Sequence, residues 1–241
     1  MARIDGRAAD QLRPIEIIPN INRFAEGSCL IRCGNTHVLC TASVEERTPP
    51  HVPEGEGWVT AEYSMLPRAN RERSRRDISK GKLSPRSAEI QRLVGRALRA
   101  AVDLKKLGAR TITIDCDVLQ GDGGTRTASV TGGFVALSYA CWKLVEEGVI
   151  PEMPITTCVA AVSAGIVDDV PMLDLCYEED SSAMVDLNCV MNHEGEIIEL
   201  QGTGEGRAFT IAEQRQLVDL CAKGIREIQA IQKAVLEGGD A

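Results

Sequence analysis

The feature that most constrains this chain's fold is a glycine-rich turn joining a buried strand pattern to an apolar helix pattern. Residues 111–119 are rich in β-branched residues, which predicts a buried strand. The turn follows within residues 121–133, GDGGTRTASVTGG. Apolar residues then recur at helical spacing and define one face, formed by Val130, Phe134, Leu137, Cys141 and Leu144. This region predicts a strand, a tight turn and a helix in direct succession.

Short alternating or apolar patterns upstream predict strands at residues 15–18, 28–33, 36–43 and 58–64. Gly34-Asn35 separates the second and third patterns and is typical of a two-residue hairpin turn. A helix should then begin with Ser84 as its cap and Pro85 in its first turn. We expect that helix to end at Leu107-Gly108.

The second half of the chain again passes from strands to a helix. Strand patterns cover residues 156–167, 172–177, 183–191 and 196–201, which we expect to form an antiparallel meander. A long amphipathic helix over residues 210–236 closes the chain. This order predicts an α+β fold. Because no linker or repeat divides the sequence, residues 1–241 should form a single domain, with parts at about 10–140 and 155–236.

Charge is distributed unevenly along the chain. The whole chain carries −8, but residues 67–82 carry +5 and the remainder −13. A polyanion would therefore be repelled by most of the surface and attracted to this segment. A solvated, mobile loop is the alternative interpretation. The basic residues of the segment are Arg68, Arg71, Arg73, Arg75, Arg76, Lys80 and Lys82.

The cysteines and the N-terminus bear on the cellular compartment. Nine scattered cysteines, mostly in apolar segments, are expected to be reduced core residues, and none has zinc-finger spacing. We identify no signal peptide and no apolar run of membrane-spanning length. The sequence therefore predicts a cytoplasmic protein that does not associate with membranes.

The glycine-rich turn is also a candidate anion site. A helix that starts there presents unpaired backbone N–H groups at the positive end of its dipole. The candidate phosphate-binding residues are Gly124, Thr125, Arg126 and Ser129, because hydroxyls donate hydrogen bonds and a guanidinium can hold a phosphate with two. The spacing matches neither a P-loop nor a dinucleotide fingerprint. A purely structural glycine turn is an equally good explanation at this point.

Two groups of arginines lie on the preceding helix pattern. Arg86 falls near the helix N-terminus, where a cation is disfavoured unless a bound anion compensates it. It is therefore a further phosphate-binding candidate, although an ordinary surface arginine would look the same. Arg92, Arg96 and Arg99 lie on the face opposite the apolar residues and are candidate contacts for a polyanion.

Three aspartates recur at six-residue intervals: Asp174, Asp180 and Asp186. A hairpin centred on Asp180 would place Asp174 and Asp186 opposite one another on paired strands. Carboxylates gathered in this way would suit Mg²⁺ or Mn²⁺. A polar turn with solvated acids is the alternative.

These motifs together closely resemble the ribonuclease PH family over essentially the whole chain. The resemblance rests on Ser84-Pro85-Arg86, on the glycine-rich run, on the acidic stretch at residues 178–186, and on Gly202-Thr203-Gly204-Glu205-Gly206. It implies a fold like domain 2 of ribosomal protein S5, with a left-handed β-α-β crossover. It also implies a homohexameric ring built as a trimer of dimers.

The resemblance further implies a phosphorolytic 3′-to-5′ exoribonuclease and reversible nucleotidyltransferase that trims RNA, with transfer-RNA precursors as substrates. Inorganic phosphate would be the co-substrate, held by Arg86 and by residues 124–126. Arg126, Asp180 and Asp186 would be the catalytic residues, with Asp180 and Asp186 binding Mg²⁺, or Mn²⁺ in its place. The basic segment would guide the RNA 3′ end inward.

Two other functions remain open at this stage. A hydrolytic metal-dependent nuclease would need acids around two metals but no dedicated phosphate site. A non-catalytic RNA-binding subunit of an exosome-like ring would keep the fold and lose the phosphate or metal residues. Arg86 and the run Gly124-Thr125-Arg126 count against the hydrolytic nuclease. The presence of both the phosphate and the metal residues counts against the non-catalytic subunit.

We predict that neutralising Arg71, Arg73, Arg75 and Arg76 together weakens RNA binding and flattens its salt dependence. Each lost phosphate contact should reduce the logarithmic slope by roughly one unit. Binding titrations across salt concentrations measure this slope, and the rate on saturating short RNA should stay near that of the wild type. An unchanged slope would mean that the segment is only a solvated loop. It would also move the RNA path to the other candidate RNA contacts, Arg92, Arg96 and Arg99.

Overall fold

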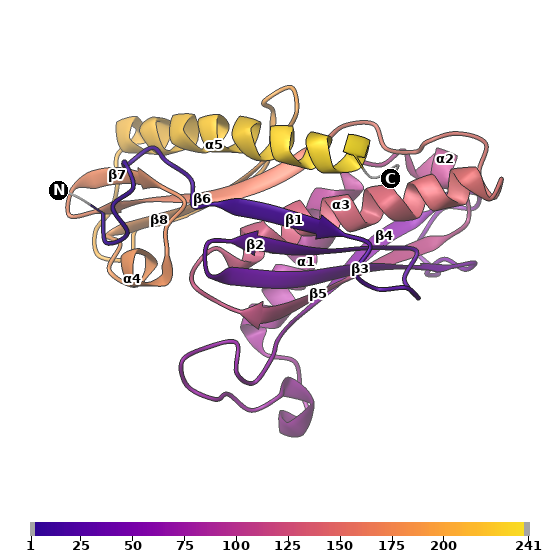
Figure 1. Cartoon of the computed structure of the whole chain (residues 1–241), viewed down its shortest axis with the longest axis horizontal. Helices are drawn as coiled ribbons and strands as arrows, with labels where there is room; N and C mark the ends of the chain where they lie inside the picture. The colour runs from indigo at the N-terminus through magenta and orange to yellow at the C-terminus, as the bar shows by residue number, and fades with distance from the viewer. Residues whose placement is uncertain (1–2, 239–241) are drawn as a thin grey trace.

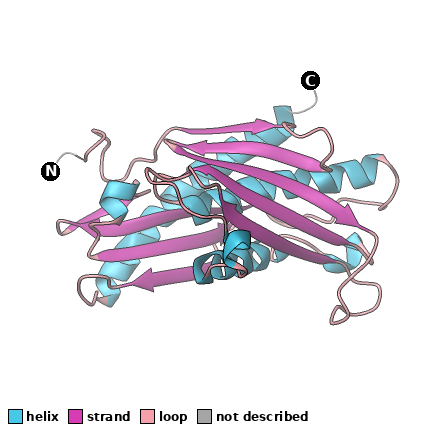
Figure 2. Cartoon of the chain, turned by 90° about the horizontal axis from the view of Figure 1, so that it is seen from below, coloured by secondary structure: helices cyan, strands magenta, loops and turns pink. Residues whose placement is uncertain are grey.

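A computed structural model describes residues 3–238 of the chain and contains two sheets, which Figure 2 shows side by side. The first sheet has the order β1-β2-β3-β5-β4, and its neighbours are antiparallel except for β4 and β5, which are parallel. Its strands are β1 (Ile15–Pro19), β2 (Gly27–Cys33), β3 (Thr36–Glu45), β4 (Trp58–Met65) and β5 (Thr111–Gln120). The predicted hairpin is confirmed, because Cys33 pairs with Thr36 across Gly34-Asn35.

Helix α1 (Pro85–Arg99) follows β4 and begins as predicted, with the Ser84 hydroxyl accepting a hydrogen bond from the Ser87 N–H. Its end was predicted wrongly. A separate one-turn helix, α2 (Leu104–Leu107), forms instead because the Asp103 side chain accepts the N–H groups of Lys105 and Lys106. Such a cap starts a new helix, so α1 ends before it.

Helix α3 (Thr125–Glu146) lies against the first sheet and is buried along most of its length. Glycine is required at its closest approach, since a Cβ at Gly132 would lie 2.8 Å from the Ile31 side chain. In the described part of the chain, α3 is the one helix long and apolar enough to cross a membrane. However, 83% of its most apolar stretch is buried inside the protein, as in the core helix of a globular domain.

The second sheet has the order β7-β6-β8-β9 and is antiparallel throughout. Its strands are β6 (Val159–Val167), β7 (Val170–Leu173), β8 (Val185–Asn192) and β9 (Ile197–Thr203). The predicted meander and its Asp174–Asp186 pairing are therefore wrong, because β6 lies between β7 and β8. The physical reason is that β6 is buried at all nine positions, which suits a central strand covered on both faces.

Helix α5 (Ile211–Gly238) covers the second sheet and reaches β1 and α3, so it spans both halves of the molecule (Figure 1). Leu217, Cys221, Ile225 and Ile228 form its buried face. Helices α3 and α5 each pack against both sheets, so they connect the first half of the chain to the second. All nine cysteines are free and eight are buried, which confirms the prediction of reduced core residues.

The buried ion pair between Arg13 and Asp174 helps to join the N-terminal segment to the second sheet. The Arg13 guanidinium donates to both Asp174 carboxylate oxygens, at 3.0 Å and 2.6 Å, and the Arg13 backbone N–H donates to the same group at 2.8 Å. Burial alone would raise the pKa of Asp174, but the charge and hydrogen bonds of Arg13 hold it below its usual 3.8. Asp174 is therefore a structural anion in the folded protein.

Asp174→Asn should lower the free energy of unfolding at pH 7 by about 3–5 kcal/mol, because it leaves buried Arg13 without its charge partner. Asparagine tolerates the positive φ of 53° at this position, so the loss reports the charge. Urea denaturation measures the difference.

The effect has a defined pH dependence, since the pKa of Asp174 is lowered on folding. The difference between wild type and variant should persist down to about pH 4 and narrow only at lower pH. Asp169→Asn, at a side chain 91% exposed, is the matched control and should change the unfolding free energy by less than about 0.5 kcal/mol. Equal losses in both variants would contradict the assignment.

Candidate active site

Residues from both halves of the chain line one polar cavity of about 340 Å³. It brings together six residues predicted from the sequence: Arg86, Gly124, Thr125, Arg126, Asp180 and Asp186. It also contains Ser163, Asn188 and Glu205, which the sequence did not identify as site residues. Glu205 lies in the glycine-rich run at residues 202–206, so that motif could have identified it from the sequence.

The N-terminus of α3 forms one wall of the cavity. Gly124 occupies its N-cap position in the left-handed region, with φ 65°, and no side chain caps the helix. Its first N–H groups are thus available to an anion. The Thr125 hydroxyl is 2.9 Å from the Tyr63 hydroxyl. Ser129 was predicted to join this site, but it is buried and its hydroxyl donates to the Thr125 carbonyl at 2.8 Å, so it lies outside the cavity lining.

Arg126 is held in place by two side chains from other elements. Its Nη1 donates to Gln201 Oε1 on β9 at 2.7 Å and to Glu89 Oε1 on α1 at 3.3 Å. Gln201 also donates to Glu89 Oε1 at 3.0 Å, which closes the triangle. This support fixes the plane of the guanidinium beside the N-terminus of α3.

Two aspartates form the opposite wall. Asp180 ends the short helix α4 (Tyr177–Asp180), and Asp186 lies on β8, paired with Gly165 of β6. Burial, reinforced by the nearby Asp180 charge, raises the pKa of Asp186 to about 6, although Arg126 and Asn188 act to lower it. Burial likewise raises the pKa of Asp180, against the lowering effect of Arg86 and Arg126. The two carboxylates therefore repel each other in a partly desolvated site.

The donor set fits a divalent cation. Asp186 Oδ1 is buried without a hydrogen-bond partner, whereas Oδ2 accepts from Asn188 Nδ2 at 3.1 Å. An orphaned carboxylate oxygen in a cavity that also contains a second carboxylate suits a hard metal ion. Within residues 3–238, no three His, Cys, Asp or Glu side chains lie close enough to hold a metal by themselves. A magnesium-type site would accordingly be completed by waters and substrate phosphates.

Asp174 does not belong to this group. The position predicted for it opposite Asp186 is wrong, since its carboxylate is committed to Arg13 and it is absent from the cavity lining. The sequence spacing was regular, but the second sheet does not pair β7 with β8. The three evenly spaced aspartates therefore have two different roles: Asp174 pairs with a buried arginine, whereas Asp180 and Asp186 line the cavity.

The basic segment, residues 67–82, forms a long loop between β4 and α1 that extends from the body of the protein in Figure 1. It contains a single 3₁₀ turn, η1 (Asp77–Lys80). The five arginines of the loop are exposed, and Arg71 pairs with Glu178 of α4 at 2.8 Å. These arginines are Arg68, Arg71, Arg73, Arg75 and Arg76.

The arginines of α1 are placed differently from one another. Arg96 pairs with Glu199 at 2.6 Å, and Arg99 lies over the Trp58 ring, 4.2 Å from its centroid. Arg92 is exposed. Two of the three candidate RNA contacts thus have intramolecular partners.

Family models match most of the chain. The model for the 3′ exoribonuclease family, domain 1, matches residues 11–142, and that for domain 2 matches residues 157–223. The chain belongs to the 3′ exoribonuclease family. A protein of Neisseria gonorrhoeae named Ribonuclease PH is 57% identical over 95% of this chain and 96% of its own length. One of the same name from Syntrophomonas wolfei is 53% identical over 98% of this chain and 99% of its own.

A solved structure that resembles this 3′ exoribonuclease is more distant in sequence. The Archaeoglobus fulgidus exosome with RNA bound to the active site has a chain with a TM-score of 0.77 and 25% identity, covering 95% of this chain and 91% of that one. The much higher identity to proteins named Ribonuclease PH favours the enzyme over an exosome-like subunit without activity. This family member is a phosphorolytic 3′-to-5′ exoribonuclease and nucleotidyltransferase.

Proposed function

We propose that the cavity between α3 and the second sheet is where phosphorolysis of RNA takes place. One observation carries this proposal: Arg86, Arg126 and the uncapped N-terminus of α3 face the same cavity as Asp180 and Asp186. The first group would bind inorganic phosphate, and the second would hold Mg²⁺ or, in its place, Mn²⁺. A hydrolytic nuclease would have no use for the cationic wall.

The proposed reaction follows from the placement of charge. A phosphate oxygen attacks the last internucleotide phosphorus, the bond to the 3′ oxygen of the preceding ribose breaks, and that oxygen takes up a proton. A nucleoside diphosphate leaves, and the RNA is one nucleotide shorter. Arg86 and Arg126 offset the charge of the attacking anion, while Gln201 and Glu89 hold Arg126 in orientation. A bound divalent cation would supply neutralisation of the charge that develops on the transferring phosphoryl group.

The basic segment would receive the RNA. Its exposed arginines extend from the body of the protein, and we infer that they contact the phosphates of transfer-RNA precursors near their 3′ ends. We further propose a homohexamer, built as a trimer of dimers, working in the cytoplasm. The likeness to an exosome with RNA bound to its active site supports RNA as the partner.

The phosphate site is tested by Arg126→Ala, which should lower the phosphorolysis rate on the order of 10²-fold or more, as for loss of one preorganised donor. Arg126→Lys should not restore it, because lysine lacks the planar fork that the Gln201–Glu89 pair orients. The assay incubates 3′-tailed RNA with and without phosphate and identifies the released nucleotide. Monophosphate release at equal rates without phosphate would contradict the proposal.

The cation site is tested by Asp180→Asn and Asp186→Asn. Each should abolish most activity while RNA binding persists, because the amide keeps the shape but loses the charge. Isothermal titration with Mn²⁺ should show weakened binding in both variants and unchanged binding in the exposed control Asp169→Asn. Near-normal rates and Mn²⁺ binding in both active-site variants would mean that the aspartates are only polar residues of the cavity.

A further inference from the structure

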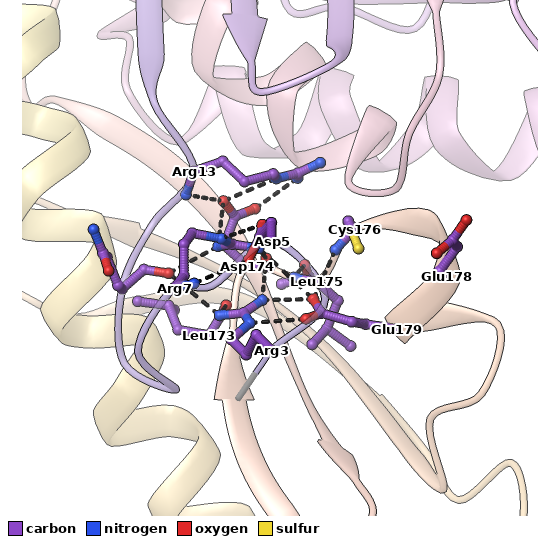
Figure 3. Close-up of polar contacts among 12 residues, drawn as sticks. Arg3, Asp5, Arg7, Arg13, Leu173, Asp174, Leu175, Cys176, Glu178 and Glu179 are labelled. Carbon is purple, nitrogen blue, oxygen red and sulfur yellow. Dashed lines mark hydrogen bonds and ion pairs between the residues drawn. The ribbon is translucent and has the colours of Figure 1, made fainter. Parts of the chain in front are cut away.

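The N-terminal segment, residues 3–13, carries three arginines that the reaction above does not use. The side chains of Arg3, Arg7 and Arg13 are only 1%, 7% and 4% exposed, respectively. Figure 3 shows all three converging on Asp174 and Glu179, which come from the end of β7 and from α4. Burying three guanidinium groups is costly unless each is paired and hydrogen-bonded, so their arrangement requires an explanation.

Arg3 makes the most complete set of contacts. Its Nε and Nη2 donate to the two carboxylate oxygens of Glu179 at 2.8 Å and 2.6 Å, in the bidentate geometry. Its guanidinium also donates to the Leu173 and Asp174 carbonyls at 2.7 Å and 2.9 Å. Arg3 therefore holds both the chain entering α4 and the helix itself.

Helix α4 depends on such contacts because it has only four residues. A single helical turn is not stable by itself, so tertiary contacts determine its orientation. Glu179 Oε2 accepts the backbone N–H of Cys176 at 3.1 Å and so links Arg3 to the start of the helix. The next residue is Asp180, which faces the cavity.

The N-terminal segment also contacts the glycine-rich turn that precedes α3. Arg13 bridges Asp174 to the Asp122 carbonyl, with Nη1 donating to that oxygen at 2.5 Å. The Asp122 carboxylate in turn accepts the Tyr177 N–H at 3.2 Å. The two walls of the cavity are thus tied to each other through the N-terminal segment.

We propose that Arg3 is a positioning residue for the reaction: through Glu179 it orients α4 so that Asp180 and Asp186 can bind one cation. This inference rests on the proposed cation site. If it holds, disturbing the pair weakens cation binding and leaves phosphate binding, which depends on α1 and α3, nearly unchanged. A purely structural ion pair would alter thermal stability without this selectivity.

The first test is Arg3→Lys, which keeps the charge but cannot make the bidentate pair. We expect Mn²⁺ to bind about 10- to 100-fold more weakly in isothermal titration, the range typical for loss of a residue that supports a metal ligand. KM for phosphate should change by less than about twofold. Arg32→Lys, at a half-buried arginine paired with Glu16 on the first sheet, is the matched control and should leave both quantities unchanged.

The double variant Arg3→Met with Glu179→Met tests the positioning role in a protein that is expected to remain folded. Replacing both members of a buried ion pair by apolar residues of similar size costs less than removing one partner. This variant still loses the hydrogen bonds to the Leu173 and Asp174 carbonyls and to the Cys176 N–H, so it should melt below the wild type but above the single variant Arg3→Met. If it folds and binds Mn²⁺ as tightly as the wild type, the positioning role is wrong. Weakened Mn²⁺ binding in a folded double variant would support it.

Asp180→Asn distinguishes failure of the proposed cation site from failure of the positioning role of Arg3. If it binds Mn²⁺ like the wild type, the proposed cation site itself fails, and the role of Arg3 fails with it. If Asp180→Asn loses Mn²⁺ while both Arg3 variants retain it, only the positioning role is overturned.

Discussion

The cavity depends on the close contact between the turn after β5 and the chain that enters α4. Gly123 lies so near this chain that a Cβ would be 2.6 Å from the Leu175 carbonyl oxygen. Its positive φ of 74° adds a second reason for glycine. The contact brings the N-terminus of α3, from the first half of the chain, against Asp180 from the second half. Without it, the cationic and anionic walls would not face one another.

The arginines on one wall of the cavity stabilise the negative charges of the aspartates on the other. Burial and the nearby Asp180 charge raise the pKa of Asp186, whereas Arg126 lowers it. Burial also raises the pKa of Asp180, against the lowering effect of Arg86 and Arg126. The site thus contains fixed charges of both signs in a confined volume. Such a site can accept an anion on one wall and a cation on the other while its net charge stays small. This arrangement suits phosphoryl transfer, in which both ligands carry charge.

Positive and negative charge are also separated in the chain as a whole, which carries −8 but has a basic loop at residues 67–82. Most of the surface would repel RNA, and the exposed arginines between β4 and α1 are a local exception. Arg71 pairs with Glu178, next to the residue that Arg3 holds. The loop, α4 and the N-terminal segment therefore meet beside the cavity, which places the proposed RNA contacts close to the proposed chemistry.

Most strands, the α3 and α5 helices, the Gly34-Asn35 hairpin and the Ser84 cap could be predicted from the sequence, because each depends on residues close together in the chain. The strand expected at residues 172–177 was wrong beyond Leu173, where β7 ends and the chain turns into α4. The same holds for the cavity residues in recognisable runs, such as Arg86, Arg126 and Asp186. Pairing of β6 with both β7 and β8 could not be predicted, since strand order depends on which strand is buried on both faces.

The different roles of Asp174 and Asp180 followed from that strand order, and the inward-facing Asn188 and buried Arg3 gave no local signal. Sequence by itself determined the elements and the chemical groups available. Tertiary packing decided which groups meet, because burial and charge pairing act between residues far apart in the chain.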